Sequence, residues 1–211
     1  MLRTMTSILL AAALAFVLAA CGTRQPIEGQ PTDGLDRKLS TFAFIEQGDL
    51  VTFIVDTHAA RYRDKSAFMP LEIALANSGL KNLVVTRESF TLIDENGVRY
   101  PAASPRELYE GYDFLDIDRD QLAELELIVH SKFAAYTRYE SKFSPTHFTR
   151  RENDLSAATT VRDTVSLPRL GYLMDFIYFP KPETGIKGHR FELFLDAQGL
   201  EDPVFLKFEV K

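Results

Sequence analysis

The sequence has 211 residues and a formal net charge of −6, with 45% hydrophobic and 26% charged residues. This length suits one domain with a substantial core, and the acidic balance argues against a nucleic-acid partner, because phosphates attract clustered Lys and Arg. An acidic body is also expected to be repelled by anionic lipid head groups. The single cysteine excludes a disulfide within the chain.

The first 20 residues have the features of a secretory signal peptide. Arg3 gives a weakly basic start, and Ile8 to Ala20 form an uninterrupted run of 13 apolar residues. A membrane-spanning helix needs about 20 such residues. The run is therefore too short to span a bilayer, and it has the length of the apolar region of a signal peptide.

The segment Leu18-Ala19-Ala20-Cys21 resembles the bacterial lipobox. The resemblance implies that the Cys21 thiol receives a diacylglyceryl group and that Cys21, carrying acyl chains such as palmitate, becomes the first residue after cleavage. Two or three acyl chains anchor a protein firmly to a membrane. Gly22 stands where Asp retains lipoproteins in the inner membrane of enteric bacteria, which implies outer-membrane sorting if the organism has two membranes. The alternative is an ordinary signal peptide followed by a coincidental cysteine.

Residues 21–40 are predicted to be a lipidated amino terminus followed by a flexible tether. The stretch GTRQPIEGQPTDGLDRKLS is rich in Gly and Pro and poor in apolar residues. Such a composition buries too little surface to fold alone. We expect it to hold a folded body, residues 41–211, close to the membrane of the cell envelope.

The body is predicted to be mainly β. In LVTFIVD, the apolar residues Val51, Phe53 and Val55 alternate with other residues, which is the period of a strand with one buried face. Asn96-Gly97 suits a tight hairpin between SFTLID and VRY. The other expected strands are PLEIALAN, NLVVT, DTVSL, YLMDFIYF, RFELFLD and PVFLKFEV. Many short strands separated by turns predict an antiparallel sandwich.

A helical insertion is predicted at about residues 104–147. SPRE is a capping box from Ser104 with Pro105 at the first helical position, and its helix is expected to end near Gly111. A second helix is expected from about Arg119 to Tyr139, capped by Asp118, although LELIVH within it is also compatible with a strand. Its apolar face comprises Leu122, Leu125, Val129, Phe133 and Tyr136.

The segment LEIALANSGLKNLVVTRESFTLIDENGVRYP resembles the core of immunoglobulin-like sandwich domains in bacterial surface lipoproteins of unknown function. The shared pattern is an apolar strand, an Asn-x-Gly loop, a second strand, F-x-L-I-D and a Gly turn leading to R-Y-P. It covers about 30 residues. The resemblance implies an immunoglobulin-like fold and no reaction, and the helical insertion has no counterpart in the simplest members.

The best chemical candidate is the acidic segment DFLDIDRDQLAELE. Asp116, Asp118 and Asp120 are spaced like the first three ligands of a calcium loop. Gln121 stands where such a loop needs Gly, and Leu127 stands where it needs a bidentate Glu. These aspartates are therefore weak metal candidates, and the favoured interpretation is an acidic helix start.

No other pattern predicts a reaction. The four histidines, His58, His130, His147 and His189, are far apart in the sequence. The sequence has no nucleophile elbow, no phosphate loop and no dinucleotide fingerprint. We therefore expect no catalytic residue, no cofactor and no enzyme activity.

The favoured function is a non-catalytic, lipid-anchored module of the cell envelope that binds a protein or another envelope component. The alternative is an envelope enzyme or carbohydrate-active domain whose site forms only on folding. The expected binding surface is the free face of the insertion, with Arg138 and Lys142. Three aromatic residues belong either to the core or to an outward patch: Phe179, Phe194 and Phe205.

Overall fold

The computed structural model describes residues 37–38, 40–121, 123–141, 143 and 164–211. The chain divides into two units, Met1–Pro31 and Thr32–Lys211. The predicted signal peptide, Cys21 and most of the tether lie outside the described residues. So do Leu122, Lys142 and residues 144–163.

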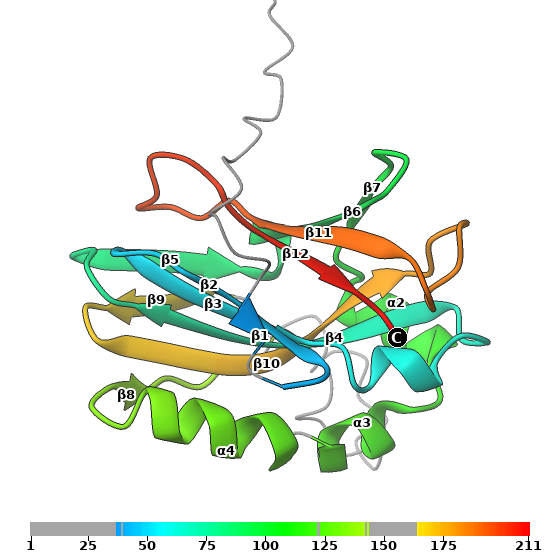
Figure 1. Cartoon of the computed structure of the whole chain (residues 1–211), viewed down its shortest axis with the longest axis horizontal. Coiled ribbons are helices and arrows are strands. Elements are labelled where there is room, and N and C mark those ends of the chain that lie inside the picture. Colours follow the sequence, from blue (N-terminus) through cyan, green and yellow to red (C-terminus); the bar gives the residue numbers. More distant parts are fainter. Residues whose placement is uncertain (1–36, 39, 122, 142, 144–163) are drawn as a thin grey trace, which may run out of the picture. The chain divides into compact units, whose positions relative to one another are not determined.

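A six-stranded sheet runs through the middle of the body (Figure 1). Its strand order is β1-β2-β3-β4-β10-β8. The strands are β1 (Arg37–Lys38), β2 (Ala43–Gln47), β3 (Val51–Asp56), β4 (Phe68–Asn77), β10 (Gly171–Pro180) and β8 (Thr137–Arg138). β4 and β10 pair antiparallel over their whole length, and β8 is parallel to β10. Because β1 pairs with β2, strand structure begins before the predicted body boundary at residue 41.

A four-stranded sheet faces the six-stranded sheet, in the order β12-β11-β6-β7. Its strands are β12 (Val204–Glu209), β11 (Arg190–Leu195), β6 (Phe90–Asp94) and β7 (Arg99–Pro101). A separate antiparallel pair comprises β5 (Asn82–Thr86) and β9 (Thr164–Pro168). All nine predicted strands are present in these sheets. The short strands β1, β2 and β8 are additional.

The main core lies between the two sheets. The predicted inward residues of β3, which are Val51, Phe53 and Val55, belong to it. The ring of Phe53 lies 6.0 Å from that of Phe90 on β6, between centroids. Residues of β5 and β9 are also part of this core. The prediction of a mainly β body is therefore confirmed, with two sheets that share one core. The predicted antiparallel pairing does not extend to β8, which is parallel to β10.

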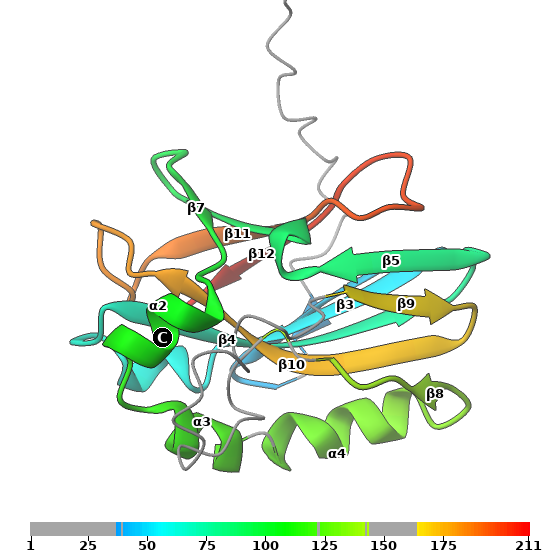
Figure 2. The same ribbon diagram turned by 180° about the vertical axis from the view of Figure 1, so that it is seen from behind.

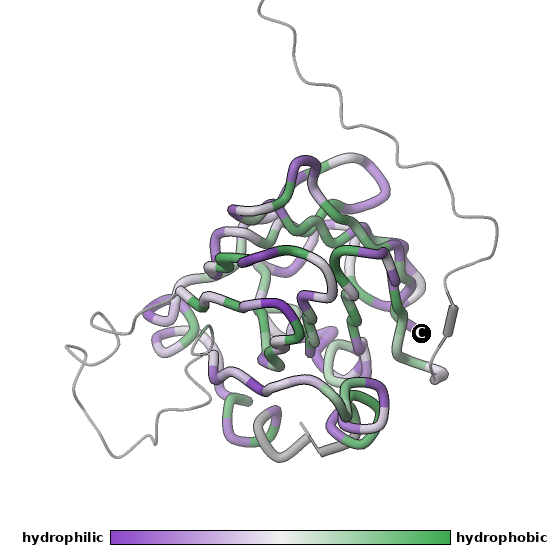
Figure 3. Tube along the Cα trace, turned by 90° about the vertical axis from the view of Figure 1, so that its left-hand side faces the viewer, coloured by the Kyte–Doolittle hydropathy of each residue, from purple (hydrophilic) through white to green (hydrophobic). Residues whose placement is uncertain are grey.

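In the described part of the chain, three helices pack on the other face of the six-stranded sheet, as Figures 1 and 2 show. They are α2 (Pro105–Gly111), α3 (Leu115–Gln121) and α4 (Ala123–Lys132), and short 3₁₀ turns occur at η1 (Ala60–Tyr62) and η2 (Arg87–Ser89). α4 packs through Leu125 and Val129 against small sheet residues such as Ala74 and Ala76. Figure 3 views this arrangement from the side, with hydrophobic stretches of the strands in the interior. No helix in the described part of the chain is long and apolar enough to cross a membrane.

The predicted second helix is wrong in extent. Residues 115–132 form two helices, α3 and α4, and Asp118 lies within α3 rather than at a cap. The chain then turns, and the Thr137 amide donates to the Leu170 carbonyl at 2.9 Å, while the Tyr139 amide donates to that of Tyr172 at 2.7 Å. Pairing with the sheet edge therefore replaces helix after Lys132. LELIVH is helical, within α4.

The hairpin between β6 and β7 has the predicted glycine turn. Gly97 has a φ of +80°, in the left-handed region that favours glycine. The Asp94 carboxylate accepts hydrogen bonds from the amides of Asn96 and Val98, both at 2.9 Å. Because Asn96 does not have a positive φ, the turn is not the doubly left-handed type that the Asn-Gly pair suggested.

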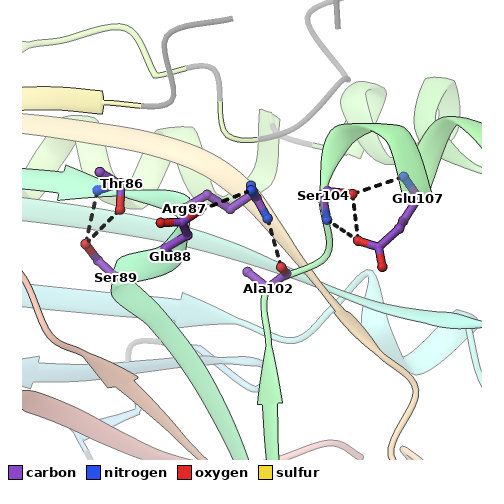
Figure 4. A network of polar contacts seen from close by, with 7 residues as sticks. All are labelled: Thr86, Arg87, Glu88, Ser89, Ala102, Ser104 and Glu107. Atoms are coloured by element: carbon purple, nitrogen blue, oxygen red, sulfur yellow. Dashed lines mark hydrogen bonds and ion pairs between the residues drawn. The ribbon is translucent and has the colours of Figure 1, made fainter. Parts of the chain in front are cut away.

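The capping box that starts α2 is confirmed (Figure 4). The Glu107 amide donates to Ser104 Oγ at 3.2 Å, and the Ser104 amide donates to Glu107 Oε2 at 2.7 Å. A second box, Thr86 with Ser89, starts η2. Arg87 lies between the two boxes and donates to the Ala102 carbonyl at 2.9 Å. These contacts fix the path of the chain from the four-stranded sheet into the helical layer.

The capping box makes a testable prediction for Glu107. Hydrogen bonds from the Ser104 side chain and amide lower the pKa of Glu107. Its contribution to stability is therefore present above the unfolded pKa of about 4.3 and is lost as pH falls through the lower folded pKa. We expect Ser104→Ala to raise the pKa of Glu107 and to destabilise the protein by about 1 kcal/mol. Side-chain NMR titration and urea melts measure both effects, and an unchanged Glu107 midpoint would contradict this account.

Candidate functional site

The three aspartates of the calcium-like segment do not form a joint site. Asp116 is exposed on α3, whereas Asp118 is fully buried. The side chain of Asp120 lies outside the described residues. Within the described ranges, no group of three His, Cys, Asp or Glu residues is placed to hold a metal ion. The spacing of Asp116 and Asp118 therefore does not place both carboxylates around one point.

Asp118 instead forms the centre of a buried polar cluster with Arg63, Tyr112 and Tyr178, named here the Asp118 cluster. Arg63 donates from Nη2 to Asp118 Oδ1 at 2.5 Å. The hydroxyls of Tyr112 and Tyr178 donate to Asp118 Oδ2 at 2.5 Å and 3.3 Å. Arg63 Nε also donates to the Tyr112 hydroxyl at 3.1 Å. Both carboxylate oxygens are thus hydrogen-bonded to groups from three other parts of the chain.

The elements that supply this cluster are distant in sequence. Arg63 directly follows η1, Tyr112 follows α2, and Tyr178 lies on β10. The ring of Phe114 covers the guanidinium, with its centroid 4.4 Å from Arg63 Cζ. The cluster therefore ties α2 and α3 to the sheet and to the turn after β3.

Burial and charge act in opposite directions on these groups. Burial raises the pKa of Asp118, and the hydrogen bonds from Tyr112 and Arg63 offset part of that rise. Burial, the largest single influence, lowers the pKa of Arg63, but the combined interactions with Asp118 and Tyr112 outweigh it and raise the pKa, so Arg63 remains a cation. The pKa values of Tyr112 and Tyr178 are raised, mainly by burial, and both hydroxyls remain protonated donors. Because Asp118 is 0% exposed, its carboxylate is not presented to solvent.

The outer face of the four-stranded sheet carries an aromatic patch. Phe194 on β11 and Phe205 on β12 are directly opposite each other, with stacked rings 5.5 Å apart between centroids. Arg99 Cζ lies 5.9 Å from the Phe194 centroid, and Lys207 Nζ lies 5.8 Å from the Phe205 centroid. Lys207 also pairs with Glu192 at 2.9 Å. We name these five residues the outer sheet face.

This face has no helical layer in the described part of the chain, because α2, α3 and α4 all lie on the six-stranded sheet (Figure 1). Phe194 and Phe205 are half-buried, and Arg99 and Lys207 are exposed. Phe179, the third aromatic residue that was left open, is fully buried in the main core. The outward interpretation therefore holds for Phe194 and Phe205 and is wrong for Phe179.

The predicted binding face of the insertion is only partly described. Arg138 lies on β8, rather than on a helix, and its Nη1 pairs with Glu126 Oε1 at 2.6 Å. Lys142 lies outside the described residues. Leu127 on α4 is 78% exposed, so this face carries an apolar side chain beside an exposed ion pair.

The described histidines are not brought together. The His58 ring makes a tilted contact with Phe42 and an edge-on contact with Tyr62. His130 is exposed on α4, and His189 pairs with Glu95 at 2.7 Å. The described histidines and the Asp118 cluster therefore provide no site that is open to solvent and built for a reaction. Two surfaces remain as candidates for binding a partner: the outer sheet face, and the surface with Leu127, Glu126 and Arg138, named here the helical face.

The comparisons with known proteins give one structural likeness. A scan of family models and a search of curated proteins found no match. A crystal structure of a candidate lipoprotein (ycdA) from Bacillus subtilis is similar, with a TM-score of 0.38 and 14% sequence identity. The likeness covers 78% of this chain and 38% of that protein, so this chain spans well under half the length of its neighbour. A likeness this distant carries no argument about function.

Proposed function

We propose that the chain is a non-catalytic, lipid-anchored module of the bacterial cell envelope that binds a protein or another envelope component. The segment ending at Cys21 supports the lipid anchor, and Gly22 supports sorting to the outer membrane of a two-membraned organism. The immunoglobulin-like topology is part of this proposal. It is supported by two sheets that face each other across one core and are antiparallel apart from the short β8–β10 pairing.

The single observation that carries the binding role is the outer sheet face. Stacked Phe194 and Phe205 present apolar surface on the four-stranded sheet, and Arg99 and Lys207 lie beside their rings. Aromatic residues and Arg are enriched at protein interfaces and dominate their energetics. A cross-strand aromatic pair also stabilises a sheet by about 0.2–1 kcal/mol, so the test must separate binding from stability.

We expect the double substitution Phe194→Ala and Phe205→Ala to abolish capture of an envelope partner while lowering stability by only about 1 kcal/mol. The measurement is cross-linking and pull-down of the full chain from its native membranes, alongside thermal melts. Tyr109→Ala on α2 is the matched control, because Tyr109 is an exposed aromatic residue on another layer. Unchanged capture by the double variant would remove the outer sheet face as the binding surface.

The helical face is the second candidate surface for the same function, since Leu127 is exposed beside the Glu126–Arg138 pair. Charge reversals at Arg138 and Lys142 test it in the same assay. Loss of the ion pair alone is expected to cost less than 1 kcal/mol, because exposed pairs contribute little. If these reversals abolish capture and the phenylalanine variants do not, the binding surface belongs to the insertion.

The alternative of an envelope enzyme or carbohydrate-active domain has a separate test. The purified full chain is incubated with cell-wall glycan, and soluble products are measured over time. We expect no turnover. Release of soluble fragments in proportion to protein concentration would contradict the non-catalytic part of the proposal.

A further inference from the structure

Four side chains gather at one end of β3 and form a surface cluster, named here the Arg61 cluster. Phe42 precedes β2, His58 follows β3, and Arg61 and Tyr62 belong to η1. Arg61 Cζ lies 4.5 Å from the Phe42 ring centroid and 5.0 Å from that of Tyr62. The His58 ring lies 5.2 Å from the Phe42 ring and 5.4 Å from the Tyr62 ring. The guanidinium is thus held by ring contacts on two residues.

This cluster faces solvent in the described part of the chain. Tyr62 is 56% exposed, and Phe42 and Arg61 are half-buried. Among the described residues, no carboxylate forms an ion pair with Arg61. A guanidinium held by aromatic rings keeps N–H groups that match the geometry of a phosphate. Its neighbour Tyr62 has an apolar ring and a polar hydroxyl, which suits the boundary between lipid and water.

The charges near the cluster differ in sign from the acidic chain as a whole. Lys65 follows η1, and the Lys181 ammonium donates to the backbone carbonyl of Asp64 beside it. The acidic residues described next to the cluster are Asp56, which is buried and accepts from the His58 amide, and Asp64, which is exposed. With Arg61, the solvent-facing side chains at this end have a basic balance, whereas the net charge of the chain is −6. An anionic surface that repels most of the body therefore attracts this end.

The position of the cluster along the chain also favours a membrane. This step rests on the proposed lipid anchor at Cys21, because Phe42 follows Cys21 by only 21 positions. If this segment is the tether predicted from its composition, it spans about 25 Å on average. A folded body of this size is roughly 40 Å across. The anchor therefore keeps the Phe42 end close to the lipid and lets the opposite end point away.

We propose that the Arg61 cluster docks the body onto the bilayer surface, with Arg61 binding a lipid phosphate and Tyr62 lying in the head-group layer. Docking gives the anchored body a fixed orientation. The helical layer and the outer sheet face then lie to the sides, and the turn between β2 and β3 points away from the membrane.

The test uses nitroxide spin labels on the lipidated full chain in vesicles of phosphatidylethanolamine and phosphatidylglycerol. Cys21 is the single native cysteine and its thiol is consumed by the anchor, so Tyr62→Cys is labelled at one position. Leu50→Cys is the control, because Leu50 is 49% exposed at the opposite end of β3. We expect the label at 62 to be more accessible to oxygen and less accessible to a polar nickel chelate than the label at 50. Equal accessibility at both positions would overturn the docking proposal.

A second measurement separates docking from anchoring. The Cys21→Ala chain is floated with the same vesicles, and Arg61→Glu is expected to weaken its partitioning on the order of tenfold. Flotation that does not change with Arg61→Glu would overturn the proposal even if the anchor is present. Conversely, if wild type incorporates no palmitate, the anchor fails while this flotation still reports on the Arg61 cluster. Shielding of the label at 62 in native membranes but not in vesicles would identify an envelope protein as the occupant and overturn the lipid proposal.

Discussion

Replacing Asp118 by Ala is expected to lower the free energy of unfolding by about 3–5 kcal/mol, because it leaves a buried cation without its counter-ion. Arg63 is 5% exposed and Asp118 is 0% exposed, so water cannot replace the lost partner without a local rearrangement. The hydroxyls of Tyr112 and Tyr178 also lose their acceptor. Urea unfolding of the full chain measures the change as a lower midpoint at constant slope.

The control for this prediction is Asp116→Ala. Asp116 lies on the same helix two residues earlier, but it is exposed. Its replacement is expected to change stability by no more than about 1 kcal/mol. Tyr112→Phe keeps the ion pair and removes one hydrogen bond, so an intermediate loss of about 1–3 kcal/mol is expected. Equal effects of Asp118→Ala and Asp116→Ala would show that the Asp118 cluster does not stabilise the fold.

The alternation of apolar residues in the sequence was sufficient to predict most of the strands. The alternation of Val51, Phe53 and Val55 correctly indicated the side of β3 that lies in the main core. The prediction of only one buried face was wrong, because Ile54 on the other side is buried beneath α4. β2 was missed because it lacks that alternation. Phe44 packs in the core between the sheets, and Ile45 packs beneath α4. A strand covered on both faces has a continuous apolar run, which local periodicity does not distinguish from other buried segments.

The residue at which α4 ends depends on tertiary contacts that the local sequence does not encode. The apolar positions Leu125, Val129 and Phe133 correctly indicated the face of α4 that packs on the sheet. The same spacing continued to Tyr136, yet the chain left the helix to pair with β10 at Thr137. Tertiary pairing with a strand more than 30 residues later overrode the local period.

The candidate sites also differ in how far local sequence could predict them. Leu193 and Leu195 of β11 lie in the main core and Phe194 lies on the outer face, a placement that the sequence had left open. The Asp118 cluster carried no signal in the local sequence. Arg63 and Tyr178 lie 55 and 60 positions from Asp118. The sequence predicted an acidic helix. The role of Asp118 as a buried counter-ion became clear only from the folded structure.

Replacing Cys21 by Ala is expected to abolish acylation and release the protein from the membrane, or to leave uncleaved precursor there. The thiol is the atom that would carry the diacylglyceryl group, and no second cysteine can substitute for it. Losing two or three acyl chains removes far more binding than the Arg61 cluster supplies, since each buried methylene contributes about 0.8 kcal/mol. Incorporation of labelled palmitate and fractionation of cells measure the effect.

The folded body should be unaffected by the same substitution, because the chain has no disulfide to lose. Thermal melts of Cys21→Ala therefore provide the stability control. Gly22→Asp is the matched variant for sorting: it keeps acylation, and in a bacterium that follows the enteric rule it shifts the protein to the inner membrane. Labelled palmitate in the Cys21→Ala protein would contradict the assigned attachment site. An unlabelled wild type with normal cleavage would instead favour an ordinary signal peptide, and the envelope module would then act without a lipid anchor.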